Sequence, residues 1–212
     1  MVDSYRRVAK AAQREFVVQK SRFIGHTLPA ETEEEALGFI ADIKEQYRDA
    51  SHNCYAYVVG LHQEIQRFQD DGEPGGTAGM PILDVIKKSE LTNVVVVVTR
   101  YFGGILLGAG GLVRAYSQAA SEAIREAGIV CMIFSSRYTM PLDYSLLGKM
   151  ENFLRSSSYL LEDITYLEHV KMQVLVRQDE EEAFLRDIAE LSDGKVHPIK
   201  GESLYHPWES ET

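Results

Sequence analysis

The spacing of apolar residues in the first half of the chain predicts strands that alternate with helices. Residues 94–98 are five valines without polar alternation, which predicts a central strand covered on both faces. Residues 52–61 alternate with the period of two that is typical of a strand with two different faces. Residues 17–28 also favour extended chain, in a single run.

Helices are expected where apolar positions recur three and four residues apart. Thr32 precedes Glu35 by three residues, which predicts a capping box at the start of an amphipathic helix. Its apolar positions are Ala36, Leu37, Ile40, Ile43 and Tyr47. A short helix is predicted for residues 81–88, where proline suits the first turn. Residues 69–79 between these segments are rich in glycine and acidic residues, which predicts a loop.

A glycine-rich segment precedes the longest predicted helix. Residues 103–111 carry five glycines, and residues 112–127 follow as a helix that ends at Gly128, a natural C-cap. A strand is predicted next for residues 129–134, before the consecutive serines at 135 and 136.

The pattern after residue 135 predicts a second, smaller domain. Strands are expected at residues 138–142, 159–167, 170–176 and 195–200, with helices at 144–154 and 179–191. The order β-α-β-β-α-β within about 70 residues is the ferredoxin-like plan. The fold class is therefore α+β in two domains, 1–135 and 136–212, and residues 205–208 are expected to form an aromatic terminal tail.

Charge and composition narrow the function classes. The 212 residues carry a net charge of −10, which argues against a protein whose whole surface grips nucleic acid. Residues 1–135 hold 14 basic and 17 acidic side chains, against 8 and 15 in residues 136–212, so any anion-binding surface is expected on the first domain. Cys54 and Cys131 form no disulfide framework. We expect a cytoplasmic protein without a signal peptide and without membrane contact.

The glycine-rich segment is the strongest candidate for function. Glycines allow positive φ and close approach of a partner, and the helix that follows offers unpaired N–H groups to an anion. Arg100 and Arg114 flank the segment, and either could contact phosphate or carboxylate through two nitrogens. The spacing is neither a Walker loop nor a dinucleotide fingerprint. The alternative is tight strand-to-helix packing, with Tyr101 and Phe102 filling the core.

The acidic loop has two interpretations as well. Asp70, Asp71 and Glu73, with His52 nearby, could bind magnesium through oxygen ligands. Alternatively, their carboxylates cap backbone N–H groups of consecutive turns. We also expect this loop and the glycine-rich segment to face each other across one groove, with Arg100 pairing with a carboxylate. No nucleophile–base pattern is present, so an enzyme is less expected than a binding protein, and no cofactor is expected.

Two motifs resemble the YigZ/IMPACT family. The long one is residues 97–116, Val-Val-Thr-Arg-Tyr-Phe-Gly-Gly-Ile-Leu-Leu-Gly-Ala-Gly-Gly-Leu-Val-Arg-Ala-Tyr, and the second is residues 70–79, Asp-Asp-Gly-Glu-Pro-Gly-Gly-Thr-Ala-Gly. Residues 21–23 and 52–54 resemble shorter flanking motifs. The resemblance implies a left-handed β-α-β fold, shared with RNase PH, the fourth domain of elongation factor G and the GHMP kinases. It also implies a ferredoxin-like domain behind it.

The resemblance implies a translation-linked binding function. Eukaryotic relatives regulate translation initiation by competing for a ribosome-associated activator of a starvation-sensing kinase. The expected partner here is RNA, the ribosome or a translation factor; the alternatives are a phosphate- or nucleotide-binding small-molecule enzyme and a pure protein adaptor, and the oligomeric state stays open. The residues expected to bind are His52, Asp71, Glu73, Arg100, Tyr101, Phe102, Gly103, Gly104, Gly108, Gly110, Gly111 and Arg114.

Overall fold

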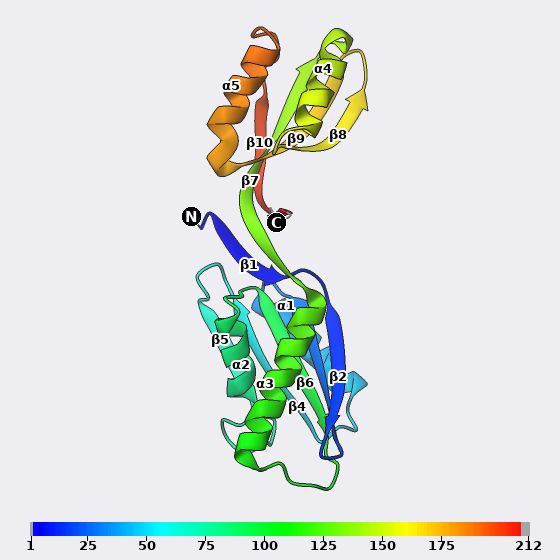
Figure 1. Ribbon diagram of the computed structural model, residues 1–212, viewed down its shortest axis with the longest axis vertical. Helices are drawn as coiled ribbons and strands as arrows, with labels where there is room; N and C mark the ends of the chain where they lie inside the picture. The colour runs from blue at the N-terminus through cyan, green and yellow to red at the C-terminus, as the bar shows by residue number, and fades with distance from the viewer. Residues whose placement is uncertain (1, 209–212) are drawn as a thin grey trace. The chain divides into compact units, whose positions relative to one another are not determined.

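The computed structural model describes residues 2–208 and shows a two-domain α+β protein, as expected (Figure 1). The chain folds into two compact units, Ser4–Cys131 and Met132–Trp208, each with its own sheet and helices. The domain boundary predicted at residue 135 stays a prediction. Among residues 2–208, no helix combines the length and apolar character needed to cross a bilayer.

The first unit is built on a five-stranded sheet in the order β2-β3-β6-β4-β5, with every neighbouring pair antiparallel. Its strands are β2 (Ala12–Val18), β3 (Ser21–Pro29), β4 (His52–Val59), β5 (Ile65–Gln69) and β6 (Val94–Tyr101). The five valines of β6 are completely buried in the middle of the sheet, which confirms the predicted central strand. Burial on both faces explains why the run contains no polar residue.

Helices cover both faces of this sheet. α1 (Glu33–Gln46) packs its buried residues against Val95, Val97 and Tyr57, and its capping box between Thr32 and Glu35 is present as predicted. α2 (Gly79–Lys88) and α3 (Gly108–Ala127) pack on the opposite face, which Figure 1 shows in front. The odd and even valines of β6 therefore serve two separate hydrophobic cores.

Two β-α-β connections in this unit each skip one strand. α1 joins the parallel strands β3 and β4, and α2 joins the parallel strands β5 and β6. The two connections differ in three ways. Their first strands, β3 and β5, run in opposite directions, the connections cross the sheet in opposite directions, and their helices lie on opposite faces. Those three reversals give them opposite hands, so one crossover is left-handed, as the resemblance implied, against the general right-handed preference.

The second unit has the ferredoxin-like order that the sequence predicted. Its elements are β7 (Ile129–Leu142), α4 (Tyr144–Arg155), β8 (Leu160–Tyr166), β9 (Val170–Arg177), a short 3-10 turn (Gln178–Glu180), α5 (Glu181–Leu191) and β10 (Ile199–Trp208). The strand order β10-β7-β9-β8 places the first and third strands of the motif in the centre. α4 and α5 contribute Met150, Leu154, Phe184 and Ile188 to a core on one face of the sheet.

Several predicted boundaries were wrong. The serines at 135 and 136 do not end a strand, because both are buried inside the continuous strand β7 and their hydroxyls bond Ile133 O and Ser203. The last strand is Ile199–Trp208 rather than residues 195–200, so the expected aromatic tail is part of β10, with Trp208 Nε1 donating to Ser135 Oγ.

In the first unit, residues 17–28 are not one extended run. They contain a tight turn at Gln19 and Lys20, whose φ angles of 45° and 63° are uncommon for residues other than glycine or asparagine. The strands β5 and β1 (Ser4–Val8) were not predicted. α3 begins at Gly108, four residues before the predicted start, so that Gly110 and Gly111 lie within its first turn.

Candidate functional site

A pocket of about 520 Å³ opens in the first unit between the acidic loop and the glycine-rich segment. Its polar lining comes from Ser51, His52, Glu73 and Arg100, and its apolar lining from Pro74, Phe102, Leu106, Leu107, Gly108, Ala109 and Leu112. The expectation that the two loops face each other across one groove is confirmed. Volumes of about 300–1,000 Å³ are usual for ligand sites, so the space is large enough to bind one.

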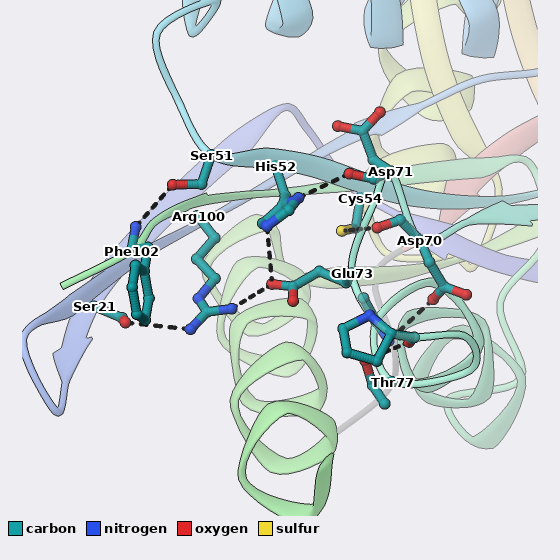
Figure 2. A network of polar contacts seen from close by, with 12 residues as sticks. Ser21, Ser51, His52, Cys54, Asp70, Asp71, Glu73, Thr77, Arg100 and Phe102 are labelled. Carbon is teal, nitrogen blue, oxygen red and sulfur yellow. Dashed lines mark hydrogen bonds and ion pairs between the residues drawn. The ribbon is translucent and has the colours of Figure 1, made fainter. Parts of the chain in front are cut away.

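Arg100 and Glu73 form the buried floor of this pocket (Figure 2). Arg100 Nη1 lies 2.5 Å from Glu73 Oε1, and the two side chains are only 5% and 4% exposed. The guanidinium lies 5.4 Å from the ring centroids of both Phe23 and Phe102, and its Nη2 donates to Ser21 Oγ at 3.4 Å. The expected pairing of Arg100 with a carboxylate is therefore confirmed, and its charge is neutralised inside the protein.

Glu73 accepts a second hydrogen bond at the same oxygen, and a buried thiol lies next to the donor. The hydroxyl of Tyr116, which comes from α3, donates to Glu73 Oε1 at 2.7 Å. Burial raises the pKa of Tyr116 far above its ordinary value, so this phenol stays a donor at any physiological pH. The thiol of Cys54 donates to the carbonyl of Asp70 at 2.9 Å, and burial raises its pKa to about 12, so it is no thiolate nucleophile.

His52 stands at the edge of this cluster in a fixed orientation. Its Nδ1 lies 2.8 Å from the backbone oxygen of Asp71, which only accepts hydrogen bonds, so Nδ1 carries the proton. In the neutral ring Nε2 is then the acceptor, and it lies 3.9 Å from Glu73 Oε1. The ring contributes a polar side to the pocket without being deeply buried.

The acidic loop uses its carboxylates to cap backbone groups. Asp70 accepts from the N–H groups of Gly76, Ala78 and Gly79 at 2.7–3.1 Å, which caps the start of α2. This confirms the capping interpretation for Asp70. Within residues 2–208, no three His, Cys, Asp or Glu side chains are grouped so as to hold a metal, so the magnesium interpretation of Asp70, Asp71 and Glu73 has no support.

Asp71 anchors the loop to two neighbouring elements. Its carboxylate accepts from Asn53 N at 2.7 Å and from Lys44 Nζ at 2.9 Å. Partial burial alone would raise the pKa of this carboxyl, but the hydrogen bonds from Asn53 and Lys44 outweigh it and hold the pKa below its usual value. Asp71 therefore positions His52 through its backbone oxygen while its side chain points away from the pocket lining.

The five glycines of the segment 103–111 occupy structurally different positions. A Cβ on Gly103 would lie 2.0 Å from the carbonyl carbon of Lys20, so the chain passes directly against the β2–β3 turn. Gly104 and Gly108 have φ of 83° and 71°, which L side chains rarely adopt. Only Gly108 among the five lines the pocket. α3 begins there after Leu107, without a side-chain cap, so Gly108 and Ala109 present first-turn backbone to the pocket.

Other predicted residues lie outside the lining. Tyr101 donates to Asp49 Oδ1 at 2.8 Å, and Arg114 is exposed on α3. The pocket residues that the sequence did not single out are Ser51, Pro74, Leu106, Leu107, Ala109 and Leu112. The one available signal was the run Ile-Leu-Leu at 105–107 between glycines, an unusual place for large apolar residues.

Comparison with known proteins agrees with this architecture. The family model described as Impact N-terminal domain matches residues 19–124, which include the pocket, and a model described as a domain of unknown function (DUF1949) matches residues 141–195. A crystal structure described as that of a hypothetical protein superposes with a TM-score of 0.62 at 30% identity, covering 95% of this chain and 99% of the other.

Curated relatives match over most of the chain. IMPACT family member YvyE of Bacillus subtilis is 47% identical over 205 residues, covering 97% of this chain and 94% of the relative. IMPACT family member YigZ of Escherichia coli is 33% identical over 181 residues, with 84% and 89% covered. Protein IMPACT of Mus musculus matches 95 residues at 36% identity, 42% of this chain and 29% of its own length. The chain therefore belongs to the IMPACT family.

Proposed function

We propose that this chain is a translation-linked, cytoplasmic binding protein that engages a protein component of the translation machinery through the pocket of its first unit. The partner is a ribosomal protein or a translation factor. The translation link rests on the family resemblance, whose two long motifs supply most of the pocket residues. The choice of surface rests on the geometry of that pocket.

The observation that carries the proposal is the exposed apolar rim. Phe102, Ile105 and Leu106 are 47%, 42% and 84% exposed, and they follow one another on the segment that borders the pocket. Grouped large apolar residues beside a concavity are typical of a protein interaction site. A loop that only connects β6 to α3 does not need them.

Charge favours a protein over RNA as the partner. Binding to nucleic acid phosphates depends on free Lys and Arg side chains, whereas Arg100 is buried and paired with Glu73. The net charge of −10 also disfavours nucleic acid as the partner. Direct binding to ribosomal RNA is therefore the competing outcome in the test that follows.

The test is sedimentation with ribosomes through a salt series, for wild type and for Leu106→Ser. Leu37→Ser is the matched control, because Leu37 is 47% exposed on α1, on the opposite face of the sheet. We expect co-sedimentation that Leu106→Ser weakens and Leu37→Ser leaves unchanged. Binding that is equally strong in all three proteins, or that is lost steeply with salt regardless of Leu106, would contradict the proposal.

A phosphate- or nucleotide-binding enzyme is the second candidate, favoured by one feature. The N-terminus of the 20-residue helix α3 has no side-chain cap and opens at the pocket, whereas Asp70 caps α2 nearby. Titration with ATP, AMP and inorganic phosphate by calorimetry tests it. Saturable binding that Ala109→Leu abolishes would promote this candidate.

A further inference from the structure

We infer that the pocket receives one apolar side chain, presented by a polypeptide segment that also carries Lys or Arg close to that side chain. The inference rests on the proposed function and names the chemistry of the partner at the same site. It follows from three properties of the pocket: its floor, its walls and the charge of its rim.

The opposite charges of the floor are already paired within the protein, although Arg100 Nε is buried without a hydrogen-bond partner. Glu73 Oε1 accepts from Arg100 and Tyr116, and Ser51 Oγ accepts from Phe102 N at 3.0 Å. An occupant therefore does not need to supply a counter-charge, and an apolar group can cover the floor without breaking these bonds. An ionic ligand would instead compete with the buried pair for its hydrogen bonds, at a large desolvation cost.

The walls of the pocket are largely apolar. Phe102 and Leu106 form the exposed side, while Leu107 and Leu112 line the inner part beside α3. Burying one Leu or Phe side chain against such walls removes apolar surface from water on both partners. A few side chains buried in pockets carry most of the binding energy of a protein interface.

The charge beside the pocket favours basic residues next to the apolar anchor of the partner. Asp49 is not part of the pocket lining, but it is exposed and accepts from the hydroxyl of Tyr101, the residue before Phe102. The basic side chain beside this tyrosine, Arg22, lies 5.5 Å from the ring and pairs with Glu15, and in the described part of the chain no basic side chain forms an ion pair with Asp49. Residues 1–135, which include the whole pocket, are also weakly acidic, with 14 basic and 17 acidic side chains. Complementary charge on a partner raises the association rate and excludes acidic competitors. Lys or Arg next to the anchor would complement the acidic side chain of Asp49 in this way.

The experiment follows backbone amide NMR signals of the 15N-labelled full chain during titration with three capped pentapeptides. These are Lys-Gly-Leu-Gly-Lys, Lys-Gly-Ser-Gly-Lys and Glu-Gly-Leu-Gly-Glu. We expect the first to shift the signals of Phe102, Leu106, Leu107, Gly108 and Leu112, and the other two to bind at least about tenfold more weakly. Ala109→Leu, which fills the mouth from an exposed helical position, should remove the shifts, and Leu37→Ser should keep them.

Each other outcome overturns a stated part of the inference. Equal binding of the serine peptide removes the apolar anchor, and equal binding of the glutamate peptide removes the basic flank. Shifts at the same signals with sodium phosphate or a short RNA, but with none of the peptides, replace the inference by an anion site. An absence of shifts with all probes also overturns it.

The ribosome experiment separates this inference from the proposed function. Peptide binding at the pocket together with ribosome binding that ignores Leu106→Ser overturns the translation link and leaves the anchor standing. Ribosome binding that depends on Leu106 without any peptide binding overturns the anchor and leaves the translation link standing.

Discussion

Arg100 and Glu73, 27 residues apart in the sequence, meet as a buried ion pair at the floor of the pocket, with 2.5 Å between Nη1 and Oε1. Arg100 comes from the central strand β6 and Glu73 from the loop before α2. The pair ties the acidic loop to the sheet and gives the pocket a rigid, internally neutral floor. Arg100 is thus a positioning residue rather than a free anion-binding arginine.

Removing one partner of this pair should destabilise the first unit strongly. Arg100→Ala leaves Glu73 charged and buried, and losses of about 3–5 kcal/mol are typical of such single removals. Urea unfolding measured by circular dichroism should show this loss. The double variant Arg100→Met/Glu73→Leu is the control, and it should recover a large part of the stability; equal stability of wild type and Arg100→Ala would contradict the role assigned to the pair.

Asp70→Ala should weaken the start of α2. The substitution removes the acceptor of three backbone N–H groups, and loss of a single cap typically costs about 1 kcal/mol or more. Asp42→Ala is the matched control, because Asp42 is an exposed aspartate within α1. Hydrogen exchange of the amides of Gly76, Ala78 and Gly79 should accelerate in Asp70→Ala only; unchanged exchange would show that the carboxylate is not their acceptor.

Glycine-to-alanine substitutions in the segment 103–111 should distinguish a glycine that close packing requires from a glycine that alanine can replace. Gly103→Ala places a Cβ 2.0 Å from the backbone of Lys20 and should lower the free energy of unfolding clearly. Gly110→Ala meets only the end of Arg114 at 3.7 Å, within α3, and should raise the free energy of unfolding by about 0.5–1 kcal/mol. Thermal denaturation of both variants checks the contrast, and similar effects of both would contradict it.

Stability should fall between neutral and acidic pH because of His26. Burial lowers the pKa of this histidine from 6.5 to about 4 in the folded chain. Between these values the unfolded chain binds a proton that the folded chain does not, so this contribution is full above pH 6.5 and is lost as the pH falls towards 4. The loss amounts to about 3 kcal/mol.

The variant His26→Gln tests this pH dependence, since an amide can still bond the Thr99 hydroxyl, which lies 3.3 Å from His26 Nε2. Urea unfolding at pH 7, 5.5 and 4 should show a smaller decrease of stability for the variant than for wild type. Parallel pH curves for the two proteins would rule out a titrating His26 as the cause.

Local signals in the sequence predicted the elements that depend on local chemistry. The valine run, the capping box at Thr32 and the helix end at Gly128 were correct because each is determined by nearby residues. The β2–β3 turn was missed because Gln19 and Lys20 adopt positive φ without glycine or asparagine. Ser135 and Ser136 were misread as a break because their partners in β10, Trp208 and Ser203, are distant in the sequence.

The pocket was only partly predictable for the same reason. The motif containing Arg100 and the glycines was correctly placed beside the acidic loop. Sequence spacing could not show that Arg100 is buried, that Tyr116 from the middle of α3 reaches Glu73, or that Leu106 is exposed. These relationships join separate elements and arise only when the sheet assembles.

The most direct test of the central claim is photo-crosslinking from the pocket rim to purified ribosomes, with the photoreactive residue p-benzoylphenylalanine in place of Leu106. The same residue in place of Leu37 serves as the control on the opposite face. The account predicts crosslinks from position 106 to a ribosomal protein or a bound translation factor, and none from position 37. Crosslinks from position 106 to ribosomal RNA alone, or ribosome binding without any crosslink from that position, would contradict it.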